Sequence, residues 1–442
     1  MKRRTLLAGA AALATVPASV RAAEKTKIVW WHAMTAALGE QVNLIVDTFN
    51  KSQDAVELTA IYKGQYPDVL TATIAAFRAG QAPHLAQVFE VGTGSMLAAG
   101  KATKQVWELS KETGIAIDPK AYIPAVRGYY SLTDGRMASM PFNSSTAVMW
   151  YSKDAFHKAG LDPDKPPATW EEVVTAAKAI KDKNAAPIPV TSAWFTWIQL
   201  EQYSALHNLP FASKSDGFDG LDAQLEINSK AHVKHMQRLI DMSKDGTFKY
   251  TGRDNAPSQV VISGDAAIGF DSSASRGNMV KSAKYNWGMA FLPYDPEIIK
   301  TPLNSIIGGA SIWAMTAPGR TEAEYKAVAS FLKFLGRPEI DAQWSQNTGY
   351  VPVTFAGDEL LKKQGYYEKN PGTDLAVKQL ARGTVTNNSK GLRLGGLPQI
   401  RNIIYEEMEK AFQGGQNAQQ AMDSAVSRGN KVLRDFEKSV KS

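Results

Sequence analysis

Residues 191–202 read TSAWFTWIQLEQ and place two tryptophans three positions apart among small and polar neighbours. If these residues are helical or form a turn, Trp194 and Trp197 lie on one face. Two indole rings on one face could form the wall of a ligand cleft and contact the carbon skeleton of a small molecule. Packing in a core, or between two lobes, is an equally simple interpretation of the same spacing.

Four further segments carry polar groups in positions that suit an anion. FNSST (142–146) stands before an apolar strand, and DSSAS (271–275) follows one and could open a helix with free hydroxyl and N–H groups. IIGGAS (306–311) allows the backbone to approach another group closely. In KGLRLGGLPQI (390–400), Arg393 stands between two leucines, where its guanidinium could hold a carboxylate or phosphate bidentately. Helix caps, turns and a surface arginine over a loop are the plain alternatives.

Residues for catalysis are harder to find. The sequence has no G-x-S-x-G elbow, no phosphate-binding loop that ends in Gly-Lys-Ser/Thr, and no cysteine nucleophile. His232 and His235 stand one helical turn apart and could share a metal, but no third ligand follows at a recognised spacing. We therefore expect these two histidines on a solvated helix face, and we expect no enzyme activity, no metal and no other cofactor.

The elements that must position these groups alternate cleanly near the start of the chain. Apolar runs at 27–31, 56–62 and 84–90 are separated by two segments with helical spacing. This order of strand, helix, strand, helix and strand predicts a mostly parallel sheet with helices on its faces. Farther along, Thr169 and Glu172 form a capping box that predicts a helix after Thr169.

The later part of the chain predicts further helices, and the total length sets the number of lobes. Ile400, Ile403, Ile404 and Met408 form one apolar stripe at helical spacing. A chain of 442 residues is too long for one hydrophobic core and predicts two lobes. No linker of low complexity separates the halves, so we expect the chain to cross between the lobes more than once.

Residues 1–22 have the composition of an export signal. MKRR is followed by an apolar stretch from Thr5 to Val16 and by small residues at 20–22, where a signal peptidase would cut. The Arg3–Arg4 pair suits a twin-arginine route and an ordinary secretory signal equally. Removal of residues 1–22 removes four basic residues and no acidic one, so the formal charge falls from +7 to +3. Without cysteine the mature protein has no disulfide and no lipid-modified anchor, which predicts a free periplasmic protein.

Longer strings resemble a known family. YSKDAFHKAGLDPDKPPATWEEV, VISGDAAIGF and NTGYVPVT resemble the extracellular solute-binding proteins of carbohydrate-type ABC importers, the maltose-binding-protein superfamily. YKGQYPDVLTATIAAFRAGQAP, LPFASKSDGFDG and KGLRLGGLPQIR are similar to the sn-glycerol-3-phosphate-binding family within it. The resemblance covers essentially the whole mature chain in register.

The resemblance implies an α/β fold of two lobes, each a mostly parallel sheet flanked by helices, that close over a ligand in the cleft between them. The expected lobes are 23–140 with about 305–345, and 141–304 with about 346–442. It also implies a binding protein for sn-glycerol 3-phosphate and for glycerophosphodiesters such as glycerophosphocholine. The implied partners are the permease subunits of an ABC transporter in the inner membrane, with a cytoplasmic ATPase, and no nucleic acid.

Motif by motif, the resemblance implies a set of ligand contacts. These are Tyr66, Glu90, Ser145, Trp194, Trp197, Ser272, Gly309, Tyr350 and Arg393. Glu90 would accept hydrogen bonds from glycerol hydroxyls, the serines, the Gly309 N–H, Tyr350 and Arg393 would donate to phosphate, and the tryptophans would contact the carbon backbone and a choline group.

Asp271 departs from the family pattern because it adds a negative charge beside the expected phosphate, and it leaves Ser272 and Ser273 as alternative contacts. An oligosaccharide-binding protein of the same superfamily and an exported glycerophosphodiesterase are the alternative functions.

Overall fold

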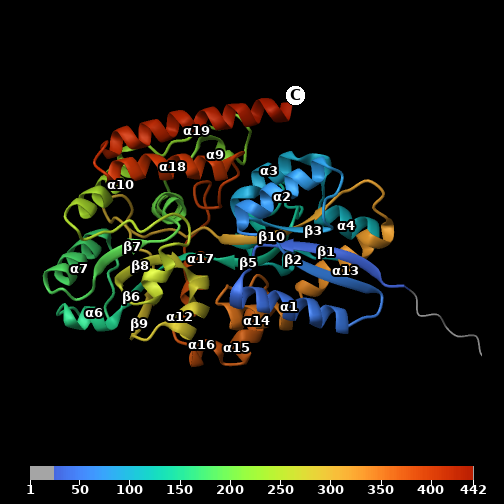
Figure 1. Ribbon diagram of the computed structural model, residues 1–442, viewed down its shortest axis with the longest axis horizontal. Coiled ribbons are helices and arrows are strands. Elements are labelled where there is room, and N and C mark those ends of the chain that lie inside the picture. Colours follow the sequence, from blue (N-terminus) through green and yellow to red (C-terminus); the bar gives the residue numbers. More distant parts are fainter. Residues whose placement is uncertain (1–23, 442) are drawn as a thin grey trace, which may run out of the picture.

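The computed structural model describes residues 24–441, so the predicted signal peptide lies outside the described residues. Two lobes lie side by side, each built around its own sheet with helices on both faces (Figure 1). The predicted α/β fold of two lobes is confirmed. None of the helices in residues 24–441 has the length and apolarity that a membrane crossing requires.

The first sheet has the strand order β2-β1-β3-β10-β4, and β5 also pairs with β10. Its strands are β1 (Thr26–His32), β2 (Val56–Tyr62), β3 (Leu85–Phe89), β4 (Thr103–Lys104), β5 (Met140–Ser145) and β10 (Gly308–Met315). Helices α1 (Ala36–Lys51) and α2 (Tyr66–Arg78) connect β1, β2 and β3, as the alternating pattern predicts. The buried residues Val42, Ile45 and Phe49 of α1 pack in the core of this sheet.

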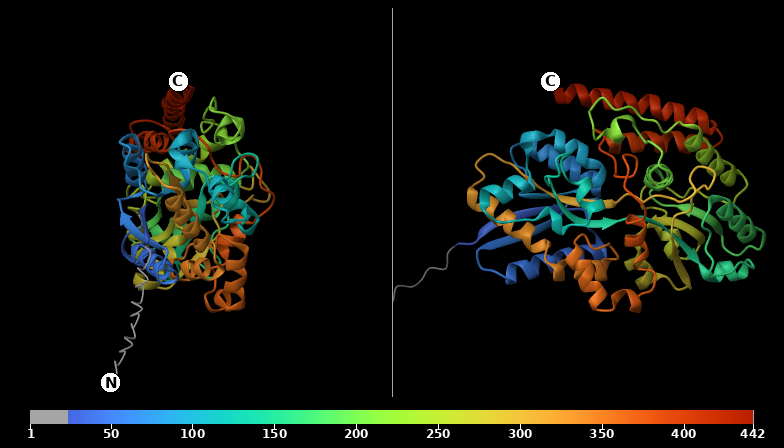
Figure 2. Two further views of the ribbon diagram at one scale, coloured as in Figure 1. Left: turned by 90° about the vertical axis from the view of Figure 1, so that its right-hand side faces the viewer. Right: turned by 180° about the vertical axis from the view of Figure 1, so that it is seen from behind.

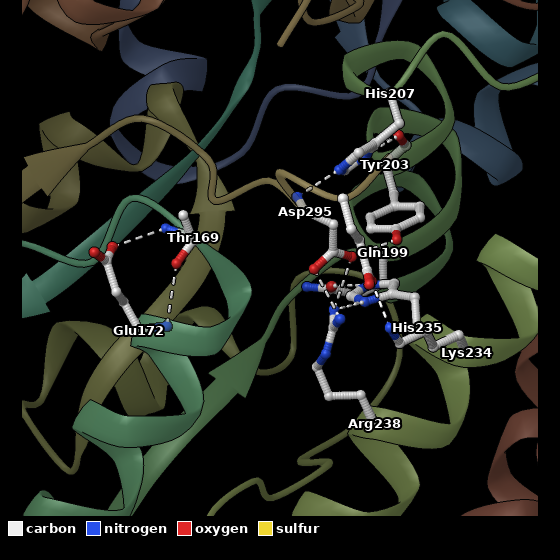
Figure 3. Close-up of polar contacts among 10 residues, drawn as sticks. Thr169, Glu172, Gln199, Tyr203, His207, Lys234, His235, Arg238 and Asp295 are labelled. Carbon is white, nitrogen blue, oxygen red and sulfur yellow. Dashed lines mark hydrogen bonds and ion pairs between the residues drawn. The ribbon is translucent and has the colours of Figure 1, made fainter. Parts of the chain in front are cut away.

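The second sheet has the order β7-β8-β6-β9. Its strands are β6 (Ala147–Ser152), β7 (Ile188–Ser192), β8 (Ala266–Ser272) and β9 (Trp287–Ala290). The capping box is present at the start of α7 (Trp170–Asp182): Thr169 Oγ1 accepts from the Glu172 N–H, and Glu172 Oε2 accepts from the Thr169 N–H (Figure 3).

Both sheets are mixed, so the prediction of mostly parallel sheets is wrong in this respect. In the first sheet β1 is parallel to β2 and β3, but β10 is antiparallel to β3, β4 and β5. In the second sheet only β7 and β8 are parallel. The reason is connectivity: β5 runs toward the cleft and leads directly into β6 of the other sheet, whereas β10 returns from that sheet and enters the first sheet from the cleft side.

The chain passes from the first sheet to the second between β5 and β6, and back between β9 and β10. Thr146 and Ser305, one on each passage, are bonded: Thr146 Oγ1 donates to Ser305 Oγ at 2.7 Å and to the Ile306 carbonyl at 3.0 Å. After α14 (Pro338–Thr348), Val351 and Val353 pack in the core of the first sheet. The residue limits of the lobes stay a prediction.

Two long helices near the end of the chain cover the lobe that contains the second sheet. Helices α18 (Leu397–Phe412) and α19 (Ala418–Lys441) pack on each other above the second sheet, and α19 extends back toward the first lobe (Figures 1 and 2). The predicted apolar stripe of α18 is buried, with Ile400 and Ile404 fully covered. The other helices are α3 (Thr93–Ala98), α4 (Val106–Thr113), α5 (Pro124–Tyr129), α6 (Lys153–Lys158), α8 (Tyr203–Leu206), α9 (Ser213–Gly217), α10 (Lys230–Lys244), α11 (Ser258–Ile262), α12 (Arg276–Ser282), α13 (Glu322–Leu335), α15 (Phe355–Lys363), α16 (Tyr366–Lys369) and α17 (Leu375–Leu380), with short turns η1 (Glu90–Gly92), η2 (Gly100–Ala102), η3 (Pro119–Ala121) and η5 (Ser273–Ser275) and the π-helix η4 (Trp197–Gln202).

Candidate ligand-binding site

A cavity of about 170 Å³ lies between the lobes and takes its walls from both. The first sheet contributes side chains at the cleft ends of its elements, including Tyr66 at the start of α2 and Glu90 directly after β3. The second contributes Trp197 on η4 and Ser272 at the end of β8. Strand ends that face a cleft in this way are the usual ligand positions of open α/β sheets.

The structure brings eight of the nine predicted residues together in this cavity. They are Tyr66, Glu90, Ser145, Trp194, Trp197, Ser272, Gly309 and Tyr350. Ser272 and Ser273 were alternative contacts, and the structure places them differently. Ser272 lines the cavity, whereas the Ser273 hydroxyl is turned away and accepts from the Thr146 N–H at 3.3 Å. Whether each of the eight contacts a ligand stays a prediction.

Arg393 is not in the cavity wall, which corrects its predicted position. Its Nη2 donates to the carbonyls of Tyr129 at 3.1 Å and Ser131 at 2.6 Å, and its guanidinium lies 4.0 Å from the centre of the Phe218 ring. The flanking Leu392 and Leu394 are buried and hold the loop in this orientation. Arg393 thus braces two segments of the chain behind the cavity.

Arg401 is the arginine that lines the cavity, and sequence reasoning missed it. It lies on α18, four residues after the buried Leu397 and four before the buried Tyr405, so it is on the buried face of the helix. A cation on an otherwise apolar stripe must have a partner, because an unpaired buried charge is very costly. The position of Arg401 within this apolar stripe is the sequence feature that could have indicated a buried, paired arginine.

Arg401 has two carboxylate partners. Its Nε and Nη2 each lie 2.7 Å from an oxygen of Glu201, and the same Nη2 also lies 3.0 Å from Oε1 of Glu90. All three side chains are buried, with exposed fractions of 9% or less. The cluster joins α18, the π-helix η4 and the turn after β3, and it reaches the cavity through Glu90 and Arg401.

Burial and charge act in opposite directions on this cluster. Burial raises the pKa of the Glu90 carboxyl to about 7, although the Arg401 charge favours its ionised form. Burial alone would lower the pKa of Arg401, but the charges of Glu201 and Glu90 outweigh it and hold that pKa above its ordinary value. Arg401 therefore stays charged, while Glu90 can change its protonation near neutral pH.

Aromatic side chains form the apolar part of the wall. The Tyr66 ring stacks on Phe89 with ring centres 5.5 Å apart, and its hydroxyl accepts a hydrogen bond of 2.8 Å from the Asn143 amide. Trp197 packs against Gly308 so closely that a Cβ there would lie 2.4 Å from the indole ring. The indole N–H of Trp197 is buried and has no partner among the described residues.

The backbone that carries the two tryptophans is unusual. Trp194 has a positive φ of 45°, and Trp197 begins the π-helix η4. Non-glycine residues with positive φ and π-helical turns are both rare and are frequent at functional sites. The π-helix directs Trp197 to the cavity, Glu201 to Arg401, and Gln202 to the backbone of Ile306, which it bonds through both amide atoms.

A buried polar cluster supports η4 from behind (Figure 3). His235 Nδ1 accepts from the Arg238 guanidinium at 3.0 Å, so its Nε2 donates to the Gln199 side chain at 3.1 Å. The imidazole stacks on Tyr203 with ring centres 4.0 Å apart, and Tyr203 and Arg238 both bond Asp295. The cluster fixes the helix that follows Trp197.

The predicted solvated face for His232 and His235 is therefore wrong. Both imidazoles are fully buried, and burial lowers the pKa of His232 to about 4 and the pKa of His235 well below its ordinary value. The two histidines lie on the face of α10 that packs against η4 and α8, where His235 bonds Gln199 and His232 bonds Ser204. No group of three metal-ligating side chains suited to a metal occurs among residues 24–441.

The chain is similar to known proteins over most of its length. Residues 45–359 match the family model described as bacterial extracellular solute-binding protein. Two relatives are each named sn-glycerol-3-phosphate-binding periplasmic protein UgpB. The one from Pectobacterium atrosepticum is 45% identical over 100% of this chain and 98% of its own, and the one from Salmonella typhimurium is 46% identical over 94% of each chain.

Solved structures share the fold at low sequence identity. The crystal structure of UgpB from Mycobacterium tuberculosis in complex with glycerophosphocholine has a TM-score of 0.78 at 19% identity and covers 93% of this chain and 99% of its own. A cyclic alpha-maltosyl-1,6-maltose binding protein from Arthrobacter globiformis has a TM-score of 0.73 at 22% identity and covers 93% and 100%. These structures show the fold.

Proposed function

We propose, from the premise that this chain belongs to the bacterial extracellular solute-binding proteins, that it captures sn-glycerol 3-phosphate and glycerophosphodiesters for an ABC transporter. Relatives named for sn-glycerol 3-phosphate match 94–100% of the chain at 45–46% identity. The observation that carries the proposal is the cavity between the lobes, which joins one buried cation–carboxylate cluster to a set of neutral hydrogen-bond donors.

The cavity has two chemically different ends in this proposal. Glu90 accepts hydrogen bonds from the glycerol hydroxyls, and Arg401 holds the Glu90 carboxylate toward them. The phosphate lies against the hydroxyls of Ser145, Ser272 and Tyr350 and the N–H of Gly309. Glu90 would repel a phosphate, so the phosphate must occupy the other end.

The glycine at position 309 is suited to such a contact. Its φ of +103° is a conformation that favours glycine, and a Cβ there would lie 2.0 Å from the Asn143 carbonyl oxygen. The Trp194 and Trp197 rings then contact the carbon backbone of the ligand and, for a choline ester, offer a face for a cation–π contact.

Ligand capture in this proposal is coupled to closure of the lobes. Because both lobes contribute walls, a ligand that contacts both stabilises the closed form over the open one. Permease subunits in the inner membrane, with a cytoplasmic ATPase, then receive the ligand from the closed form, and the protein acts in the periplasm. No catalytic step is part of this function.

Thermal unfolding of the mature protein tests the proposal. sn-Glycerol 3-phosphate and glycerophosphocholine at about 100 times their dissociation constants should each stabilise the native state by about 2.7 kcal/mol. Maltose at the same concentration should give no shift. A shift with maltose alone would contradict the ligand assignment, and phosphorus NMR that detects cleavage of glycerophosphocholine would contradict a role in binding alone.

A further inference from the structure

The charges around the cavity are mostly negative. Of the described residues that line it, Arg401 is the only cation, and its guanidinium is already shared between Glu201 and Glu90. A third carboxyl, Asp271, is 1% exposed and lies directly behind the wall. Its Oδ1 accepts from the Ser272 N–H and its Oδ2 from the Ser275 hydroxyl, both at 2.7 Å, and both serines line the cavity.

Two carboxyls therefore share one guanidinium, a third carboxyl lies behind the serines of the wall, and the donors left for a phosphate are neutral. Asp271 also takes up the Ser272 N–H and the Ser275 hydroxyl that an anion would otherwise use. The phenols against the cavity and the Arg401 cluster have raised pKa values, mainly because of burial, so they stay neutral: Tyr66, Tyr129, Tyr130, Tyr350 and Tyr405. Two charged groups lie beyond Tyr405: Asp254, which accepts from its hydroxyl at 3.4 Å, and Arg253, whose guanidinium is paired with Glu409. Among the described residues of this wall, the one cation, Arg401, is already paired, so no group there balances two negative charges on a ligand.

We infer that the cavity binds its phosphate group only as a monoanion, so that a phosphomonoester takes up a proton on binding and a phosphodiester does not. This inference rests on the proposed function. A phosphodiester carries one charge at every pH of interest. A phosphomonoester has a second pKa of about 6 and is mostly dianionic above it. The charge of the wall thus makes the protein favour glycerophosphodiesters over sn-glycerol 3-phosphate increasingly as the pH rises.

Calorimetric titrations at about pH 6 and about pH 8, in buffers free of phosphate, test the inference. The ratio of the two dissociation constants, sn-glycerol 3-phosphate over glycerophosphocholine, should rise about 50-fold between these pH values, because the monoanionic fraction falls by that factor. Titration of Glu90 acts on both ligands and cancels in the ratio. Repeating the titrations in buffers of different protonation enthalpy should count about one more proton taken up with the monoester near pH 7.5.

The outcomes separate the two proposals. If neither ligand binds at either pH, the proposed function fails. If both bind and the ratio stays constant, the cavity accepts the dianion and the inference is overturned. If the diester binds and the monoester binds at neither pH, the inference is overturned as well, because the monoanion is then rejected too.

Asp271→Asn adds a test of the charge behind the wall. Asparagine can still accept from the Ser272 N–H but removes the negative charge, so the 50-fold rise should shrink at least about threefold. Asp182→Asn, an exposed carboxylate at the end of α7, is the matched control and should keep the full rise. An equal reduction in both variants would overturn the role of Asp271, and the wild-type ratio decides the inference even if Asp271→Asn does not fold.

Discussion

Nη2 of Arg401 lies 3.0 Å from Oε1 of Glu90, although the two residues are 311 positions apart in the chain. This contact connects α18 to the turn after β3 and places the carboxylate at the cavity wall. Since Arg401 also holds Glu201 on η4, three segments that meet only in the folded protein depend on one guanidinium.

Replacement of Arg401 should damage both binding and stability. Arg401→Met leaves two buried carboxylates without their cation, so the free energy of unfolding should fall by about 3–5 kcal/mol and ligand affinity by roughly 10–100-fold. Urea unfolding and calorimetric titration measure the two effects. Arg393→Met is the matched control: it loses contacts with the carbonyls of Tyr129 and Ser131, so stability should fall while affinity changes by less than about threefold. Equal losses of affinity would contradict the assignment of Arg401.

The protonation of Glu90 should make stability depend on pH in a defined direction. The folded-state pKa is raised from 4.5 to about 7, so the folded protein holds a proton that the unfolded chain releases between these pH values. Stability from this group is present below about pH 4.5 and is lost as the pH rises to about 7. Glu90→Gln should therefore gain stability relative to wild type, by an order of about 3 kcal/mol, between pH 4.5 and pH 8. Paired denaturant titrations measure this difference, and a constant difference would show that the carboxyl does not titrate in this window.

Replacement of Gly309 in the cavity wall should reduce stability and binding through a steric clash. Gly309→Ala puts a methyl group against the Asn143 carbonyl and forces a positive φ on alanine, so stability should fall by more than about 1–2 kcal/mol and binding should weaken. Gly319→Ala, at a φ of +74° with nothing within 4 Å of the new Cβ, should cost only the conformational strain of about 1 kcal/mol and leave binding intact. Thermal unfolding with and without ligand compares them, and similar effects on binding would argue against a close approach at position 309.

The two tryptophans should respond differently. Trp197→Ala removes a buried indole that packs on Gly308 and should lower stability by about 3–5 kcal/mol. Trp194→Ala removes a partly buried ring at the cavity wall, so affinity should fall by about 10-fold with a smaller loss of stability. Fluorescence titration with glycerophosphocholine and urea unfolding measure both. Unchanged affinity in Trp194→Ala would remove that residue from the proposed contacts.

Local sequence patterns predicted the helices and strands of this fold well, whereas the features that depend on contacts between distant residues could not be predicted from them. The capping box at Thr169 and the apolar stripe through Ile400 and Ile404 depend on neighbouring residues, so the sequence contains the whole signal. The direction of β10 does not depend on neighbouring residues alone, because it is decided by where the chain re-enters the first sheet after the 162 residues from 146 to 307.

The candidate site shows the same difference between residues that local sequence identifies and residues that only distant contacts identify. The eight residues brought together in the cavity stand in strings that resemble a known family, whereas the arginine was assigned to the wrong position. Arg393, flanked by leucines and glycines, has the more conspicuous sequence context, and Arg401 lies inside a helical stripe where only its partners reveal its role. Those partners, Glu90 and Glu201, are 311 and 200 positions away. The burial of His235 likewise depends on η4, an element that helical periodicity of 3.6 does not describe.

The π-helix η4 also restricts how this protein can change over evolutionary time. A π-helical turn contains one residue more than an α-helical turn, so it accommodates an extra residue while the helix after it keeps its direction. Loss of one residue within the turn would restore ordinary pitch and leave Glu201 and Gln202 facing Arg401 and Ile306, whereas a further inserted residue would rotate them away by about 100°. Changes of length in this segment are therefore limited to the loss of that one residue, and alignments that place a single gap between residues 197 and 202 should mark receptors in which an ordinary α-helix carries the same wall.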